Sequence, residues 1–345
     1  MSHKVLVSGF SFSHMTKYGG YDKIGNNPNV SYIGSNFVSS SFHQKLIKYK
    51  VIHKFMTLLR IINLFLLDIC SRILLLIKYD VLHYVYTENQ YFLPKINKKG
   101  KKIIGTVHLN PISVENDRSL GCNKNYLRFI RNFDLLITLS SEMALLFNKR
   151  YGVKTEFVPH GFSTPSFLNV VYSDIQGNVM DKSKINILFS GTNYRDFDTL
   201  LYVIENTNNK LHFHIIGQGN TNKKEKRFNN SYINVSIYDR LTDDAYYSVL
   251  NDCDYNFLPL TFATANNVLM EAQAFGLISI LPNTSGILDY AAPGPLNIFY
   301  NNQYDALDIF NNLQKAGHDD RIADFSRRFN WGNIYKRLDE LYNSL

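Results

Sequence analysis

The stretch NNVLMEAQAFGLISILPN, residues 266–283, decides the fold because it joins a helix pattern directly to a strand pattern. Its first part has apolar residues at helical spacing behind a polar start, and LISILPN at its end is a short apolar run. A helix followed at once by an apolar strand is typical of parallel α/β sheets. Glu271 is the single acid in the helix pattern, and for that reason it is a candidate site residue.

The same alternation of strands and helices continues on both sides of this stretch. Strands are expected at residues 4–10, 80–86, 101–108, 134–140, 185–191, 211–217, 233–238, 255–260 and 277–283. Helices are expected at residues 43–78, as one helix or two, and at residues 141–150, 196–206, 242–251, 266–275, 303–316 and 330–343. The series occurs twice, with a join near the polar stretch 172–184, and therefore predicts two doubly wound α/β domains. Ligands of such domains bind beyond the carboxyl ends of the strands.

The composition is that of a folded, basic protein. The chain has 345 residues, of which 45% are apolar and 19% charged, which excludes a disordered chain and favours two domains. The net charge is +8, and basic residues cluster at Lys45, Lys48, Lys50, Lys54 and Arg60 and at Lys95, Lys98, Lys99, Lys101 and Lys102. Three distant cysteines and an N-terminus with a strand pattern predict a cytoplasmic protein without a signal peptide. Charged residues interrupt the apolar segment 43–78, so a transmembrane helix is not expected.

Two glycine turns follow expected strands and could bind phosphate. In KYGGYD, residues 17–22, Gly19 and Gly20 let backbone N–H groups approach an anion, and the alternative is a plain tight turn. In FSGTNYRDFDTL, residues 189–200, Gly191 ends a strand and Arg195 adds a cation before a helix, which suits a diphosphate. The alternative for Arg195 is an ordinary solvated position.

Two histidines stand where a ligand could reach them. His108 and His160 lie in loops after expected strands, whereas His212 and His214 share one face of a strand, as structural residues do. A histidine at a strand exit can donate to a sugar hydroxyl or a phosphate, and its alternative role is a structural hydrogen bond. We therefore rank His108 and His160 above the other histidines.

The start of the helix at 266–275 offers a second anion site. Thr264 or Asn266 can cap this helix, whose first N–H groups then suit a phosphate. Ionised Glu271 only accepts hydrogen bonds, and paired ribose hydroxyls are suitable donors for it. The alternatives for Glu271 are a carboxylate that stabilises the start of the helix and an ion pair with a lysine, and its apolar neighbours disfavour both.

Other site classes lack their motifs in this sequence. It contains no Ser-His-Asp or Cys-His arrangement, no P-loop and no metal-ligand spacing, and His83 with Glu88 is not a metal motif. We therefore expect no metal and no cofactor. Nucleic-acid binding is disfavoured as well, because the basic charge comes with no recognition motif.

A series of stretches along the chain carries a family resemblance. They are YGGYD, DVLHYVY, IIGTVH, LLITLSSEMALLF, VPHGF, ILFSGTNYRDFDTLL, FHIIGQG, YYSVLNDCDYNFLPL, ANNVLMEAQAFGLISILPNTSGILDY and FNWGNIYKRL. By these stretches the sequence resembles the GT-B glycosyltransferases of the group 1, GT4-like family. They occur in the family's order and cover nearly the whole chain, and the one from residue 265 is the most specific.

The resemblance implies a fold and a reaction. Two Rossmann-like domains, residues 1–165 for the acceptor and 166–328 for the nucleotide-sugar, would face a central cleft, and a closing helix in 329–345 would cross back to the first domain. The implied reaction is a metal-independent transfer of a sugar from a nucleotide-sugar with retention of configuration.

Individual roles follow by position from the same resemblance. Glu271 resembles the glutamate that binds the nucleotide ribose, and Asn267 and Val268 would give backbone donors to the diphosphate. Arg195 resembles the basic residue that neutralises the diphosphate. In the first domain, Gly20 lies where a loop meets the diphosphate, and His108 matches the histidine that contacts the donor sugar.

Two positions depart from the family's pattern. An acid eight residues before Glu271 is replaced by Ala263, so Thr264 and backbone groups become candidates for the contact with the donor sugar. The arginine often found after the strand glycine is replaced by Thr192, which leaves Arg195 as the cation of that loop.

These observations lead to one leading hypothesis and one alternative. The leading hypothesis is a hexosyltransferase that uses a nucleotide-sugar and a glycan or lipid-linked glycan acceptor in bacterial surface polysaccharide assembly, such as lipopolysaccharide, O-antigen or capsule. The basic, apolar segment 43–78 suggests peripheral contact with an anionic membrane, and an ordinary helix pair is its alternative. The alternative function, motivated by Ala263, is a non-catalytic GT-B scaffold that binds a sugar nucleotide or a partner glycosyltransferase.

Overall fold

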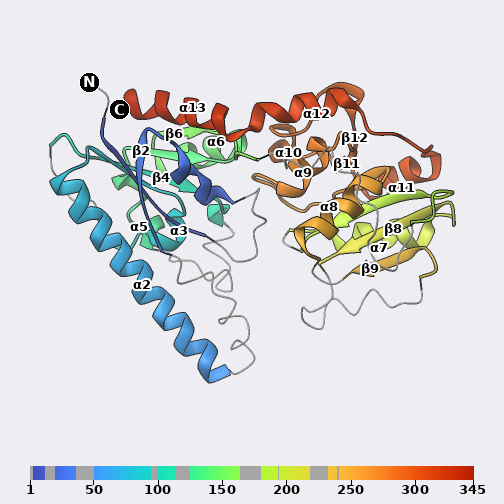
Figure 1. Cartoon of the computed structure of the whole chain (residues 1–345), viewed down its shortest axis with the longest axis horizontal. Helices are drawn as coiled ribbons and strands as arrows, with labels where there is room; N and C mark the ends of the chain where they lie inside the picture. Colours follow the sequence, from blue (N-terminus) through green and yellow to red (C-terminus); the bar gives the residue numbers. More distant parts are fainter. Residues whose placement is uncertain are drawn as a thin grey trace. The chain divides into compact units, whose positions relative to one another are not determined.

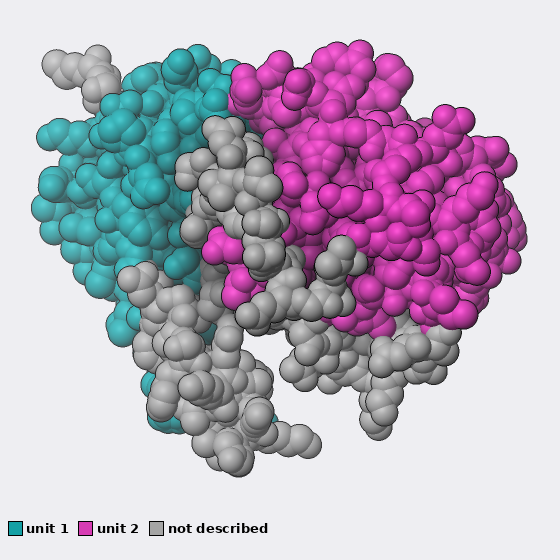
Figure 2. Space-filling view, turned by 45° about the vertical axis from the view of Figure 1, so that its right-hand side comes forward, with its two compact units in different colours: residues 1–163, 329–345 teal, residues 164–328 magenta. Residues whose placement is uncertain are grey.

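The computed structural model describes two compact units (Figure 2). Unit 1 consists of Met1–Ser163 together with Phe329–Leu345, and unit 2 is Thr164–Arg328. The described residues are 3–11, 20–35, 50–94, 99–112, 125–163, 180–192, 194–217, 232–238 and 241–345. The closing segment of the chain is thus part of the first unit.

Unit 1 is built on a six-stranded parallel sheet in the order β2-β1-β3-β4-β5-β6. Its strands are β1 (Val5–Phe10), β2 (Val30–Ser35), β3 (Val81–Tyr84), β4 (Lys102–Val107), β5 (Leu135–Thr138) and β6 (Thr155–Phe157). The helices and turns of this unit are η1 (Tyr21–Asn26), α2 (Lys50–Ile77), α3 (Thr87–Gln90), α5 (Asn125–Arg128), η4 (Ile130–Asn132), α6 (Ser141–Tyr151), η7 (Arg327–Phe329, at the boundary) and α13 (Trp331–Asn343). The inner strands are buried on both faces, as their continuous apolar runs predict.

Unit 2 is a second six-stranded parallel sheet, in the order β12-β11-β10-β7-β8-β9. Its strands are β7 (Ile185–Ser190), β8 (Leu211–Ile216), β9 (Val235–Tyr238), β10 (Tyr255–Phe257), β11 (Ile278–Pro282) and β12 (Asn297–Tyr300). Its helices are α7 (Phe197–Asn206), α8 (Asp243–Asp252), α9 (Asn267–Ala274), α10 (Ser285–Leu288), η6 (Gly294–Leu296), α11 (Gln303–Asn312) and α12 (Asp320–Ser326). This strand order is that of a Rossmann domain: successive strands are added on one side of β7 up to β9, and on its other side from β10 onward. The switch point therefore lies between β7 and β10.

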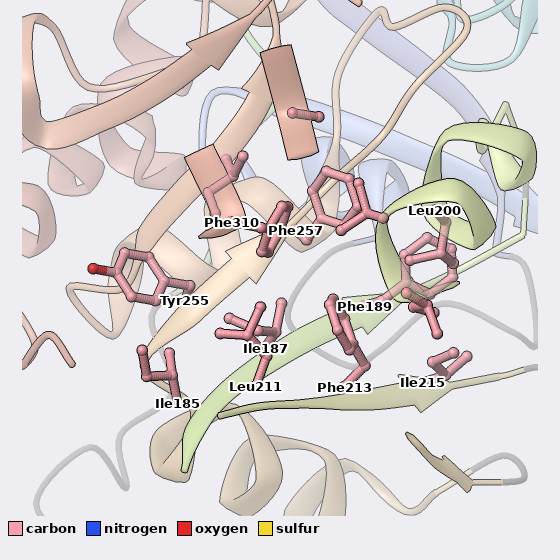
Figure 3. Close-up of a cluster of buried hydrophobic side chains, with 14 of the residues drawn as sticks. Ile185, Ile187, Phe189, Leu200, Leu211, Phe213, Ile215, Tyr255, Phe257 and Phe310 are labelled. Carbon is pink, nitrogen blue, oxygen red and sulfur yellow. The ribbon is translucent and has the colours of Figure 1, made fainter. Parts of the chain in front are cut away.

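Strand β7 is packed into the hydrophobic core of unit 2. Aromatic side chains from three elements meet over the sheet, and the ring centroid of Phe310 lies 5.7 Å from that of Phe213 and 4.7 Å from that of Phe257 (Figure 3). Ile187 and Phe189 of β7 are fully buried in the same cluster. Because both residues are fixed by packing, the loop that follows β7 starts from a rigid point.

The C-terminal helix α13 is fastened to the N-terminal part of unit 1. Its Asp339 accepts hydrogen bonds from the side-chain amides of Asn27, at 2.8 Å, and Asn29, at 2.7 Å. The Tyr335 hydroxyl donates to the carbonyl of Lys23 at 2.7 Å. Phe162 N donates to the carbonyl of Phe329 at 2.8 Å, so the residues just before α13 are also tied to unit 1.

Helix α2 has two different halves. Its C-terminal half packs on the sheet through Leu64, Leu67 and Leu75, and there Asp68 pairs with the buried Arg72 at 2.6 Å. From Lys54 to Asn63, by contrast, no described side chain of α2 is buried. Figure 1 shows this N-terminal half projecting beyond the labelled strands of unit 1. Across the part of the chain that the structure describes, no helix combines the length and apolar character needed to cross a bilayer.

Every expected strand is present, with ends shifted by a few residues, but three strands were missed. These are β2, β6 and β12, which all lie at sheet edges. The helix expected at 43–78 is present from Lys50, and residues 43–49 lie outside the described part. The helix expected at 303–316 ends at Asn312, because Leu313 has an extended backbone.

Candidate functional site

The loop after β7 carries Arg195. This loop lies at the switch point of the unit 2 sheet, where the strand order reverses between β7 and β10. Asp196 N donates to the carbonyl of Pro259 at 3.0 Å, which ties this loop to the segment after β10. Tyr194 has a φ of 57°, in the left-handed region that costs a non-glycine residue about 1–3 kcal/mol. Its carbonyl accepts a hydrogen bond from Thr261 N at 2.9 Å, which helps to hold that conformation. Such points of reversal are where doubly wound domains bind ligands.

The Arg195 side chain folds back over the end of β7. Its Nε donates to the carbonyl of Ser190 at 2.9 Å. Gly191 has a φ of 89°, and a Cβ there would lie 2.6 Å from an Nη atom of Arg195, so a side chain at this position would strain the backbone and displace the guanidinium. Burial lowers the pKa of Arg195 to about 10, and the side chain is therefore still cationic at neutral pH.

Helix α9 begins as expected, with Asn266 as its cap. The side-chain oxygen of Asn266 accepts a hydrogen bond from Leu269 N at 3.2 Å, so Asn266 rather than Thr264 has this role. Asn267 and Val268 are the first helical residues, and all three positions are half-buried. The N–H groups of a first helical turn lack intrahelical acceptors, which gives this end a partial positive charge.

Glu271 is buried, with only 3% of its surface exposed, and two tyrosines of α8 hold its carboxylate. The Tyr246 hydroxyl donates to Oε2 at 2.8 Å and the Tyr247 hydroxyl donates to Oε1 at 3.3 Å. Tyr246 also hydrogen-bonds the Ser190 side chain, and the Ser190 carbonyl accepts a hydrogen bond from Arg195 Nε. Glu271 and Arg195 are therefore connected through Tyr246 and Ser190. Burial, followed by the charge of Glu271, raises the pKa of Tyr246 well above 10, so its hydroxyl keeps its proton.

Ala263 lies buried in the loop after β10. Its carbonyl oxygen is so close to Gly286 that a Cβ there would be 2.0 Å away, which requires glycine at that position. The backbone at Ala263 is thereby fixed against α10, and its methyl group is buried. Thr264 and Thr192 are both half-buried, in the loops after β10 and β7.

The expected site residues of unit 1 gather around Tyr21. Gly19 lies outside the described residues, and Gly20 is the buried residue directly before η1. The Tyr21 ring meets the edge of His108 with centroids 4.9 Å apart and lies 5.0 Å from His160. Burial lowers the pKa of His108 to about 3 and that of His160 to about 4, so both rings are neutral at physiological pH.

A chain of buried hydrogen bonds connects this cluster to α13. His83 lies 2.7 Å from Thr106 Oγ1 through Nε2 and 2.7 Å from the Tyr342 hydroxyl through Nδ1. Trp331, at the start of α13, lies 5.8 Å from Tyr21 by ring centroids.

In unit 2, two histidines of β8 make hydrogen bonds within the sheet, which is the structural role expected for them. His212 bonds to Ser236, and His214 bonds to Asn186 and Tyr238.

Several residues of these clusters were not singled out from the sequence. Tyr246 and Tyr247 lie 25 and 24 positions before Glu271, and Trp331 lies far from Tyr21 in the chain. No local pattern indicates such contacts. Within the described residues, no group of three or more His, Cys, Asp or Glu side chains is arranged to hold a metal ion.

Comparison with known proteins gives a family match for part of unit 2 and a fold for the whole chain. Residues 184–315 match the family model described as "Glycosyl transferases group 1". A search of curated protein sequences finds no match.

Several solved structures resemble the whole chain at low sequence identity. A lipopolysaccharide outer core galactosyltransferase, WaaB, is 16% identical with a TM-score of 0.65, and the alignment covers 99% of this chain and 100% of that one. HepE from Anabaena in complex with UDP-glucose is 12% identical with a TM-score of 0.63 and the same coverage. Sucrose-phosphate synthase from Thermosynechococcus elongatus is 13% identical with a TM-score of 0.62 over 99% of both chains. Residues 184–315 therefore match the group 1 glycosyltransferase family model, and the chain as a whole has the GT-B fold.

Proposed function

We propose that this chain is a glycosyltransferase of the group 1 type that moves a hexosyl unit from a nucleotide-sugar to a glycan or lipid-linked glycan, with retention of configuration. The observation that carries the proposal is the arrangement at the switch point of the unit 2 sheet, where the loop that carries Arg195 is hydrogen-bonded to the segment after β10 and the buried Glu271 follows in α9. A cation, a helix N-terminus and a carboxylate are the groups that a nucleoside diphosphate needs for its phosphates and ribose. HepE, which has the same fold, was solved with UDP-glucose.

The proposed chemistry needs charge stabilisation more than a general base. Negative charge develops on the leaving diphosphate, and Arg195 with the start of α9 would stabilise it more in the transition state than in the ground state. His108 would contact the donor sugar, and the acceptor would bind to unit 1. We propose that no metal ion takes part, and a chelator should then leave turnover unchanged.

A thermal-shift screen followed by a turnover assay tests this function. A nucleotide-sugar present at 100 times its Kd stabilises a protein by about 2.7 kcal/mol, which should raise Tm by several degrees. The screen uses UDP-, GDP- and TDP-sugars, and donors that raise Tm are then assayed for transfer and hydrolysis. Binding without any turnover would favour the non-catalytic scaffold, and a panel with neither binding nor turnover would contradict both functions.

We further propose that the exposed face of α2 docks on an anionic membrane that carries the acceptor. Large apolar side chains repeat on one side of the helix at helical spacing and are all exposed; they are Phe55, Leu58, Ile61, Ile62, Phe65, Leu66, Ile73 and Ile77. The only acid in α2 is Asp68, which is buried in its pair with Arg72, whereas Lys54 is exposed. An apolar face that is flanked by a cation and by no exposed acid suits a membrane with anionic headgroups. Such a helix lies on the membrane surface and does not have to cross the bilayer.

Replacing Phe55, Leu58 and Ile62 together by serine should reduce binding to vesicles of phosphatidylglycerol and phosphatidylethanolamine by at least about tenfold, because each large side chain loses apolar burial. The measurement is co-sedimentation at low salt, with phosphatidylcholine vesicles for comparison. Leu145→Ser on α6 is the matched control, since Leu145 is 73% exposed but lies outside this face. Equal sedimentation of all variants would contradict membrane docking. A dimer that the triple substitution dissociates would assign the face to a second copy of the chain.

A further inference from the structure

A buried carboxylate that the proposed function leaves unused lies beside His108. Glu88 belongs to α3, directly after β3, and is 1% exposed. Its Oε1 accepts hydrogen bonds from the backbone N–H of His108 and, at 2.8 Å, from that of Leu109. Burial still raises the pKa of Glu88 to about 7. One side chain therefore binds two consecutive amides of the turn that carries His108.

The ring of His108 is fixed as well as its backbone. Nε2 lies 2.9 Å from the carbonyl oxygen of Val85, which can only accept a hydrogen bond, so Nε2 carries the proton. The ring stacks on Tyr86 with centroids 4.6 Å apart and meets Tyr21 at its edge. A neutral imidazole with its proton on Nε2 has an unprotonated Nδ1, which is an acceptor.

We propose that Glu88 is the positioning residue for His108 and that His108 accepts a hydrogen bond through Nδ1 from a hydroxyl of the bound sugar. The identity of that ligand rests on the proposed function, whereas the orientation and tautomer of the ring do not. This role differs from the expectation that His108 donates. It also selects the ligand chemistry, because an ionised phosphate oxygen has no proton to give to Nδ1, and a sugar hydroxyl does.

The first test measures the ring directly. The full chain with 15N-labelled histidine is studied by NMR, and His108→Gln assigns the His108 signals. The wild-type ring should carry its proton on Nε2 and should not titrate between pH 5.5 and 8. Glu88→Ala should change the ring nitrogen shifts, because the turn at 108–109 loses its two carboxylate bonds, and Glu88→Gln should restore them, since its amide oxygen can accept both.

A matched control separates positioning from general loss of structure. Asp134 accepts a hydrogen bond from Ile103 N at 2.8 Å, at the opposite end of β4 from His108. Asp134→Ala therefore removes a comparable carboxylate bond to the same strand, and it should leave the His108 signals unchanged. A wild-type proton on Nδ1, or His108 signals that are the same in Glu88→Ala and wild type, would overturn the proposal.

The second test is kinetic and uses any donor that the wild-type enzyme turns over. Glu88→Ala should lower kcat about tenfold with a smaller change in KM for the donor, because a misplaced contact group acts mainly in the transition state. Glu88→Gln should recover most of this loss. Unchanged kcat in Glu88→Ala would overturn the proposal. If the wild-type chain turns over no sugar nucleotide but the NMR results hold, the reaction class is wrong and the positioning of His108 by Glu88 stands.

Discussion

Glu271→Gln should weaken nucleotide binding about 10- to 100-fold while unit 2 remains folded. A carboxylate can accept about four hydrogen bonds, and the hydroxyls of Tyr246 and Tyr247 account for two of them. Under the proposed function, the ribose hydroxyls donate to the same carboxylate. Hydrogen bonds to a charged acceptor contribute about 1.5–3 kcal/mol, and 1.4 kcal/mol corresponds to about tenfold in Kd.

Glutamine is the informative replacement because the two tyrosines are buried. Glu271→Ala would leave both hydroxyls without an acceptor, at a cost of about 1–3 kcal/mol each, and a loss of binding could then reflect unfolding. Glutamine keeps a side-chain oxygen that accepts from one tyrosine hydroxyl and adds an amide group that can donate to the oxygen of the other. The measurement is the Kd of the nucleotide by calorimetry, with Tm recorded for each variant.

Tyr247→Phe is the control for this prediction. It removes the longer of the two tyrosine bonds, at 3.3 Å, and keeps the carboxylate itself. Its effect on Kd should therefore be much smaller than that of Glu271→Gln. A wild-type Kd in Glu271→Gln, at unchanged Tm, would exclude Glu271 from the nucleotide site.

The sequence predicts the central strands of both sheets better than their edges. Strands such as β1 and β7 are buried on both faces and have continuous apolar runs, which are visible without a structure. The missed strands β2, β6 and β12 are edge strands, and their residues are largely exposed or half-buried. An edge strand needs fewer apolar residues, so its pattern differs little from that of a loop.

The same contrast holds for the site. Asn266 as a cap and Glu271 in its helix are local features of one stretch, and both could be predicted from spacing. The tyrosine hydroxyls on Glu271 come from another helix, and the hydrogen bonds of Glu88 reach across two strand ends to His108. Such contacts depend on which strands are neighbours, and the order β2-β1-β3-β4 is not written in any local pattern.

Arg195→Ala should lower kcat about 10²- to 10³-fold, the effect seen when one preorganised group that stabilises developing negative charge is removed. The side chain is already held in place before any ligand arrives, because its Nε donates to the carbonyl of Ser190 at 2.9 Å. Its positive charge is retained at neutral pH, where a pKa of about 10 leaves it protonated. The measurements are kcat and KM with a donor found in the screen, together with the Kd of the nucleotide.

Arg195→Ala should lower activity without lowering the stability of the fold. Burial disfavours the charged form of Arg195, which is why its pKa lies below the usual range, so the cation itself destabilises the folded state at neutral pH. Arg195→Ala should therefore leave Tm unchanged or raise it slightly, although kcat falls. A buried charge that destabilises the folded state is typical of a functional site, whereas a solvated surface arginine has no such cost.

Gly191→Ala tests the position of the guanidinium without removing its charge. The added Cβ would lie 2.6 Å from an Nη atom of Arg195, and alanine is strained at a φ of 89°. The guanidinium should therefore shift, and kcat should fall less than in Arg195→Ala. Arg195→Lys should also have an intermediate effect, since lysine keeps a charge but cannot reproduce the Nε bond and the planar fork together. Wild-type kcat in Arg195→Ala, with nucleotide binding intact, would show that the diphosphate is neutralised by another group.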